Sequence, residues 1–146
     1  MSRSRRNPAR ARLVFVDSGA WIAFFSARDG HHPEAERRLR RAAADRILLI
    51  TSNLVLAEVH RLLLFRAGPP AARRALDVIE SSALLRIVFA TKDHHDGARG
   101  WLARFADQEI TYTDAASFAI MELSHCTAAL SFDRDFVIAG FALWNP

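Results

Sequence analysis

Short apolar runs alternate along the chain with longer segments of mixed polarity, and this alternation predicts an α/β fold. The runs show no period-two alternation, as expected of strands that are covered on both faces of a parallel sheet. They lie at residues 13–16, 47–50, 85–89 and 128–132, with a weaker fifth candidate at 141–144. We therefore expect a three-layer α/β/α sandwich around a central parallel sheet of four to five strands.

The segments between these runs have helical patterns. Helices are expected at 34–44, 54–66, 71–81, 93–106 and 113–124, and residues 21–26 are expected to form a short helix or turn before a loop at 26–33. Thr51, Ser52 and Asn53 suit the start of the second helix, and the Gly-Pro-Pro sequence at 68–70 ends it. Two glycines at 97 and 100 weaken the helical pattern of 93–106.

Composition and charge divide the chain into an arm and one domain. With 146 residues, 51% of them hydrophobic and 25% charged, the chain suits a single folded domain at 13–146. Residues 1–12 contain five arginines and no acid. They form a basic N-terminal arm, expected to be flexible, that either holds phosphates or is a solvated tail. The total charge of +4 leaves −1 for the rest, so global charge does not predict nucleic-acid binding.

Compartment and membrane signals are weak. Cys126 is the only cysteine and has no partner for an internal disulfide, which favours a reducing cytoplasm. The arm followed by an apolar run is similar to the start of a signal peptide, but Asp17 interrupts that run. No segment approaches the ~20 apolar residues that a membrane span needs, so we expect no membrane association.

Acidic residues fall where a ligand site would form. Asp17 and Asp133 each follow a predicted strand, and the carboxyl ends of parallel strands share one edge, at which crevices form. Asp114 lies at the start of a predicted helix, where backbone N–H groups favour an anion. Each residue also has a plain structural interpretation: Asp17 as a strand-end turn residue, Asp114 as a helix cap, and Asp133 as the start of a turn with Arg134.

Glu58 carries the most information among the acids. It shares a stripe with Leu54, Leu62 and Phe65 on the helix 54–66, and a carboxylate on a buried stripe needs an arginine, a proton or a metal as partner. If the four acids converge, repulsion of about 1 to 4 kcal/mol per pair at ~4 Å requires a cation. Oxygen ligands favour Mg²⁺ or Mn²⁺, because the histidine doublets at 31–32 and 94–95 lack zinc spacing and His60 points away from Glu58.

Four segments in order resemble the acidic motifs of PIN-domain ribonucleases, with the VapC-like toxins of bacterial toxin–antitoxin pairs as the closest match. They are FVDSGAWIAFF at 15–25, TSNLVLAEV at 51–59, YTDAASFAIM at 112–121 and LSFDRDF at 130–136. The resemblance spans residues 13 to about 144. It implies a metal-dependent endoribonuclease in which the carboxylates form a catalytic Mg²⁺ or Mn²⁺ site, namely Asp17, Glu58, Asp114 and Asp133.

The resemblance also implies supporting residues and partners. Ser18 and Thr113 match hydroxyl residues beside the first and third acids, whereas Gly19 replaces a common polar residue and leaves one hydrogen bond in doubt. Asp135 is a candidate for an outer position or a second metal. The implied partners are an RNA substrate, a second copy of the chain, and an antitoxin whose segment occupies the active-site groove.

Several alternatives remain at this point. A PIN-like domain without catalysis would serve as an RNA-binding or protein-interaction module. An aspartyl-phosphate phosphohydrolase would need Asp-x-Asp where Asp17 is followed by Ser18 and Gly19, and a dinucleotide fold would need a glycine-rich turn. Arginines at 37, 38, 40 and 41 either face RNA or a partner, or form a solvated helix face among neighbouring acids. The apolar residues at 62–65 suit either a partner contact or core packing.

Overall fold

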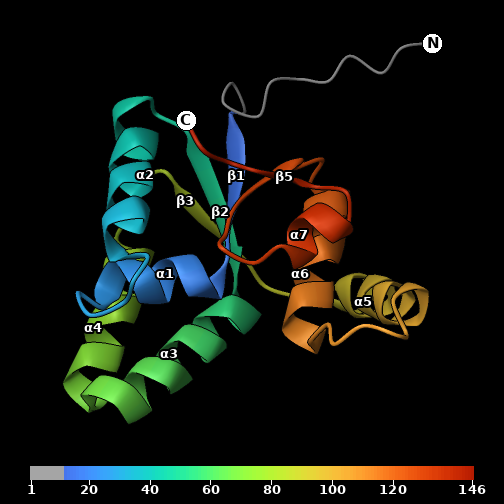
Figure 1. Cartoon of the computed structure of the whole chain (residues 1–146), viewed down its shortest axis with the longest axis horizontal. Coiled ribbons are helices and arrows are strands. Elements are labelled where there is room, and N and C mark those ends of the chain that lie inside the picture. The colour runs from blue at the N-terminus through green and yellow to red at the C-terminus, as the bar shows by residue number, and fades with distance from the viewer. Residues whose placement is uncertain (1–11) are drawn as a thin grey trace.

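Five parallel strands form the centre of the molecule, in the order β3-β2-β1-β4-β5 (Figure 1). The computed structural model describes residues 12–146. The strands are β1 Leu13–Val16, β2 Leu48–Ser52, β3 Leu85–Val88, β4 Ala128–Leu130 and β5 Ala142–Leu143. All four pairings are parallel, so the carboxyl ends of β1, β2 and β4 lie at one edge of the sheet. The predicted fold class is confirmed.

Seven helices flank this sheet in the described part of the chain. They are α1 Ser18–Phe25, α2 His32–Ala44, α3 Asn53–Ala67, α4 Pro69–Glu80, α5 Lys92–Arg104, α6 Tyr112–Leu123 and α7 Asp135–Ile138. Figure 1 shows α1 to α4 on one side of the sheet and α5 to α7 on the other. None of these helices has the length and apolarity of a membrane span within residues 12–146.

The core lies on both sides of β1, whose residues 14–16 are fully buried. On the α5–α7 side, large aromatic side chains fill the space between helices and sheet: Phe118 contacts Phe136 edge-on and also packs against Trp101. Burying a side chain of this size stabilises the fold by roughly 1.5–3 kcal/mol. This packing fixes the sheet edge from which the acidic residues project.

Element boundaries differ from the sequence predictions in ways that hydrogen bonds explain. Helix α1 begins three residues early, because the Asp17 side chain accepts from the backbone N–H of Ser18 and caps it. Strand β4 ends at Leu130, so Asp133 does not directly follow the strand as predicted. Its backbone N–H instead donates to the Oγ of Ser131, which replaces strand pairing with a local turn.

The two glycines of α5, Gly97 and Gly100, differ in the space that is available to a side chain. Helix α5 packs on α6, and a Cβ placed at Gly97 would lie 2.9 Å from the Cβ of Ala119. A Cβ at Gly100 would meet nothing within 4 Å. Gly97 therefore permits the close approach of the two helices, whereas Gly100 has no such role.

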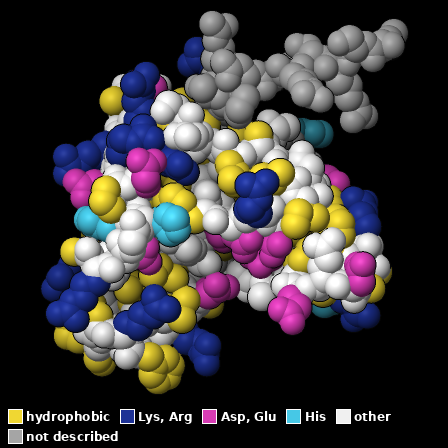
Figure 2. Space-filling model, in the orientation of Figure 1, with side chains coloured by type: hydrophobic (Ala, Val, Ile, Leu, Met, Phe, Trp, Pro, Cys, Tyr) yellow, Lys and Arg dark blue, Asp and Glu magenta, His cyan; other side chains and the backbone are white. Residues whose placement is uncertain are grey.

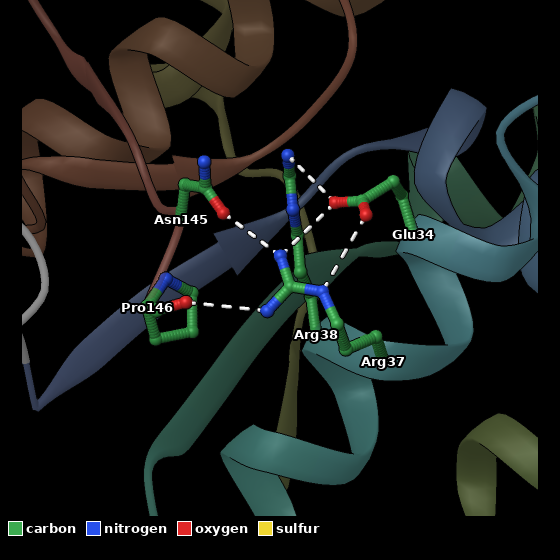
Figure 3. Close-up of polar contacts among 5 residues, drawn as sticks. All are labelled: Glu34, Arg37, Arg38, Asn145 and Pro146. Atoms are coloured by element: carbon green, nitrogen blue, oxygen red, sulfur yellow. Dashed lines mark hydrogen bonds and ion pairs between the residues drawn. The ribbon is translucent and has the colours of Figure 1, made fainter.

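The arginine-rich helix α2 uses its charges within the chain. Arg37 pairs with Glu34 at 3.0 Å and also donates to Asn145 Oδ1 at 3.0 Å and to the carbonyl oxygen of Pro146 at 3.2 Å (Figure 3). Arg38 pairs with Glu34 as well, and the remaining two arginines, Arg40 and Arg41, pair with Glu36 and Asp45. These pairings favour the interpretation of α2 as a structural and solvated face over that of an RNA-binding helix.

Candidate active site

A hollow of about 490 Å³ opens at the carboxyl edge of the sheet. All four acids predicted from the sequence line it: Asp17, Glu58, Asp114 and Asp133. Neighbouring side chains of the lining include Ser18, Thr111, Phe132 and Arg134. Figure 2 shows acidic side chains gathered at the centre of this face of the molecule. One acid directly follows β1, one lies on α3, one lies on α6, and one lies in the turn after β4.

Asp17 is the most deeply placed acid, with 4% of its surface exposed. Oδ1 accepts from the Ser18 N–H at 2.8 Å, and Oδ2 accepts from the Ser131 hydroxyl at 3.0 Å. Burial raises the pKa of Asp17 to about 7, repulsion from Asp114 adds to the rise, and the two hydrogen bonds oppose it. A nearby cation would stabilise the ionised form of this buried carboxyl.

Glu58 is half-buried on α3 and receives a hydrogen bond from the Ser18 hydroxyl, with 2.8 Å between Oγ and Oε1. Within the described residues, Glu58 forms no salt bridge with an arginine, in contrast to the structural alternative for this residue. Among residues 12–146 no site carboxylate forms an ion pair. Ser18 thus links the first acid to the second, in agreement with the supporting role that the family resemblance implied.

Asp114 lies in the first turn of α6, which Thr111 caps by accepting from the Asp114 N–H at 3.1 Å. The interpretation of Asp114 as the cap itself is therefore wrong. Burial raises the pKa of Asp114 to about 6; the bond from Thr111 lowers it, and Asp133, Glu58 and Asp135 raise it further. This carboxylate is available to a ligand because it is not needed to cap its helix.

Asp133 and Asp135 complete the acidic group. Asp133 Oδ1 accepts from the Asp135 N–H at 2.9 Å, which turns the chain into α7. One carboxylate oxygen from each of Asp114, Asp133 and Asp135 lies within 4.8 Å of the others. Burial, followed by repulsion from Asp133, raises the pKa of Asp135. The structure thus brings Asp135 into a three-carboxylate cluster, while Asp17 and Glu58 line the same hollow beside it.

The donor set suits a hard divalent cation. The hollow offers carboxylate oxygens, two of its acids have raised pKa values, and none is neutralised by a basic side chain in the described residues. No histidine or cysteine belongs to the carboxylate cluster in that part of the chain. Oxygen-only donors fit Mg²⁺ or Mn²⁺ better than Zn²⁺.

Sequence reasoning missed three residues of the site: the hydroxyl residues Thr111 and Ser131, and the aromatic residue Phe132. Thr111 stands three residues before Asp114, a spacing typical of a helix start, so this signal was available. Ser131 holds both Asp17 and the Asp133 backbone, but a single serine at a strand end carries no specific signal. The Thr113 backbone carbonyl accepts a hydrogen bond from the Ser117 hydroxyl. A Cβ at Gly19 would lie 4.0 Å from Asp17 Oδ2, so a side chain there would reach the site.

The histidines serve other purposes. His32 pairs with Glu36 and contacts the Ala23 carbonyl, and His94 belongs to the capping box of α5 with Thr91. His31 stacks on Phe132 with ring centroids 4.2 Å apart and planes 8° apart. One histidine therefore borders the acidic hollow through an aromatic neighbour.

Comparisons with known proteins agree with this geometry. The PIN domain family matches residues 14–142. The chain is 37% identical over 134 residues to the 23S rRNA-specific endonuclease VapC20 of Mycobacterium tuberculosis strains CDC 1551 / Oshkosh and ATCC 25618 / H37Rv, covering 92% of this chain and 99% of that protein.

Two solved structures are similar in fold. The crystal structure of Mycobacterium tuberculosis VapC20, described as a sarcin–ricin loop cleaving toxin, has a TM-score of 0.81 and 35% identity, and the match covers 91% of this chain and 99% of that one. FitAcB from Neisseria gonorrhoeae has a TM-score of 0.65 at 16% identity over 91% of this chain and 97% of that one, which shows a shared fold.

Proposed function

The chain belongs to the PIN-domain family, and from this premise we propose that it is a divalent-metal-dependent endoribonuclease that acts as the toxin of a toxin–antitoxin pair. The observation that carries the proposal is the convergence of four carboxylates on one hollow, with Asp135 clustered beside two of them, and without an ion pair to a basic side chain in the described residues. Similarity to a 23S rRNA-specific endonuclease over 92% of the chain supports RNA as the substrate.

We assign the cation to the three-carboxylate cluster and to its deeper neighbour. Asp114, Asp133 and Asp17 would hold Mg²⁺ or Mn²⁺, with Asp135 as an additional ligand. The cation, when bound, activates water for attack on the phosphodiester and neutralises charge on the phosphate. Asp114 and Asp17, whose pKa values are raised without a cation, would be ionised at neutral pH in its presence.

The chain's own side chains prepare the site for this reaction. Ser18 donates to Glu58 and so fixes one carboxylate oxygen, leaving the other free to orient or deprotonate a water molecule. Ser131 holds Asp17 and the Asp133 backbone together, which sets the separation of two acids that come from different strands. Arg134 lines the same hollow and is exposed, where its charge can meet the phosphate.

The partners follow from the same proposal. A cognate antitoxin would cover the acidic hollow, and a second copy of the chain would form a homodimer in the cytoplasm. Of the apolar residues at 62–65, Leu63 belongs to the core, whereas Phe65 is 78% exposed and is the best candidate for a protein contact. Size-exclusion chromatography with light scattering of wild type and Phe65→Ser tests the homodimer, because the variant should shift toward monomer.

Thermal melting tests the metal site without knowledge of the substrate. We expect Mn²⁺ or Mg²⁺ to raise the melting temperature of the wild type relative to EDTA, because a ligand at ~100 times its Kd stabilises by about 2.7 kcal/mol. Asp114→Asn should gain much less from metal. The matched control, Asp77→Asn, removes an exposed carboxylate from α4 and should respond to metal as the wild type does.

Cleavage of a sarcin–ricin loop RNA tests the reaction. We expect cleavage with Mn²⁺ or Mg²⁺, none with EDTA, and none with Asp114→Asn. Metal-dependent stabilisation without cleavage of any RNA class would favour the alternative function, a PIN-like RNA-binding or protein-interaction module without catalysis. If metal neither stabilises the protein nor supports RNA cleavage, the proposed metal site is wrong.

A further inference from the structure

His31 and Phe132 form a stacked aromatic pair at the border of the acidic hollow. Phe132 lines the hollow and directly precedes Asp133, so its ring has a fixed place relative to the acids. The two rings lie 4.2 Å apart and almost parallel. His31 is exposed, and Phe132 is the aromatic ring on which it stacks within the described residues. The pair therefore offers a flat surface next to the candidate active site.

Phe132 is held in this orientation from α2. The Arg38 guanidinium lies over the Phe132 ring, 5.2 Å from its centroid, and the Arg38 side chain is only 12% exposed. Glu34 binds Arg38 at 3.3 Å, as Figure 3 shows. The aromatic pair is thus built before any ligand arrives, and a ligand that stacks on it does not need to order it.

A second hollow, of about 570 Å³, is lined in part by residues 25–29, at the end of α1 and in the loop that follows it. Its lining includes Phe25 and Leu63, together with three arginines: Arg28, Arg66 and Arg74. All three are exposed, and none has an acidic partner within residues 12–146, in contrast to the four paired arginines of α2. We call this feature the arginine-lined hollow.

The loop between α1 and α2 joins the two hollows. Asp29 lines the arginine-lined hollow, and its carboxylate accepts from the His31 N–H at 2.8 Å. His31 in turn stacks on Phe132, which lines the acidic hollow. Acids, aromatic pair and unpaired arginines therefore follow one another across the surface. In Figure 2 the acidic side chains lie at the centre, histidine side chains to their left, and Lys and Arg side chains beyond them.

This order matches the chemistry of a single-stranded nucleic acid. Bases stack on aromatic rings without regard to sequence, and phosphates bind exposed guanidinium groups. We propose that the RNA strand leaves the acidic hollow across His31, where one flanking base stacks on the imidazole, and that its next phosphates bind the arginine-lined hollow. His31, Arg28, Arg66 and Arg74 are substrate-positioning residues on this view. The inference rests on the proposed ribonuclease function and adds the path of the substrate to it.

Steady-state cleavage of the sarcin–ricin loop RNA tests the aromatic step. We expect His31→Ala to raise KM by about fivefold or more, which is the smallest loss of affinity expected when one base–aromatic stacking contact is removed. The value of kcat should change less than about twofold. His31→Phe should restore the wild-type KM, because it keeps the ring and removes the ring nitrogens. The control His125→Asn changes an exposed histidine near the start of β4, at the opposite edge of the sheet, and should leave KM unchanged.

Salt dependence tests the arginine step. The triple variant Arg28→Gln, Arg66→Gln, Arg74→Gln should raise KM and flatten its dependence on salt concentration, because each lost phosphate contact removes about 0.7 from the logarithmic slope. The control triple Arg73→Gln, Arg86→Gln, Arg99→Gln removes the same charge from exposed arginines that line neither hollow. An equal rise in KM for both triples would mean that overall charge is responsible and would overturn this part of the proposal.

Binding measurements separate this inference from the proposed function. Fluorescence anisotropy with the same RNA in EDTA reports affinity whether or not the chain cuts it, and His31→Ala should lose affinity by a similar factor. If RNA is not cut but binding still depends on His31 and the lining arginines, catalysis fails and the substrate path stands. If RNA is cut and neither variant changes KM or affinity, the path is wrong and the ribonuclease function stands.

Discussion

The buried carboxyl of Asp17 predicts that the metal-free protein loses stability as pH rises. Its pKa is about 7 in the folded protein against 3.8 for an ordinary aspartate. A carboxyl with a raised pKa makes its full contribution to stability below pH 4, and this contribution is lost as pH rises to 7. At about 1.4 kcal/mol per pKa unit, the loss amounts to about 4 kcal/mol at pH 8, of which about 2 to 3 kcal/mol falls between pH 5 and pH 8.

Urea unfolding in EDTA, followed by tryptophan fluorescence between pH 5 and pH 8, measures this effect. Asp17→Asn cannot ionise, and its side-chain oxygen can still accept from the Ser18 N–H. We expect the free energy of unfolding of the variant, taken relative to wild type, to rise by about 2 to 3 kcal/mol from pH 5 to pH 8. Asp77→Asn, on the exposed face of α4, should show no such trend.

Two results would refute the reasoning. A difference between Asp17→Asn and wild type that is the same at pH 5 and pH 8 would mean that Asp17 titrates normally in the folded protein. A wild type whose stability at pH 8 is unaffected by saturating Mn²⁺ would mean that no cation compensates the buried charge.

The remaining predictions concern the other contacts of the site and the packing of α5. Ser18→Ala, which removes the hydrogen bond to Glu58, should lower kcat by about tenfold or more with little change in KM. The control Ser124→Ala, which lines neither hollow, should leave kcat unchanged, and rates near wild type for Ser18→Ala would exclude a positioning role for Glu58. Gly97→Ala should destabilise the fold by about 1–3 kcal/mol in urea unfolding, because its Cβ would meet Ala119 at 2.9 Å. Gly100→Ala on the same helix has open space and should stabilise by about 0.5–1 kcal/mol, so equal effects at the two positions would contradict the packing argument.

Most of the fold could be predicted from the sequence because the strands are buried on both faces. Uninterrupted apolar runs such as 13–16 identified the parallel sheet, and the alternation with helices fixed its three layers. Boundaries were less accurate wherever a side chain competes with backbone pairing. Asp17 starts α1 early, and Ser131 replaces the last residues of β4 with a turn. Such local bonds leave little trace in hydrophobic periodicity.

The candidate site could be predicted in part for the same reason. Strand ends and a helix start placed Asp17, Asp114 and Asp133 at one edge, and the stripe of α3 added Glu58. The sequence did not show that Asp135 joins the cluster, because this depends on the tight turn held by Asp133 Oδ1. It also did not show that His31 meets Phe132, since residues so far apart in sequence are brought together only by the tertiary fold.

The hydrogen bonds of Ser131 join parts of the site that are synthesised at different times. Asp17 directly follows β1, the first strand to be synthesised in the described chain. The residues that hold and complete its acidic surroundings, Ser131, Asp133 and Asp135, are translated much later. A nascent chain that lacks them has no closed carboxylate cluster, however well β1 to β3 have folded. The acidic group around Asp17 therefore cannot be completed until Ser131, 114 residues after Asp17, has been synthesised.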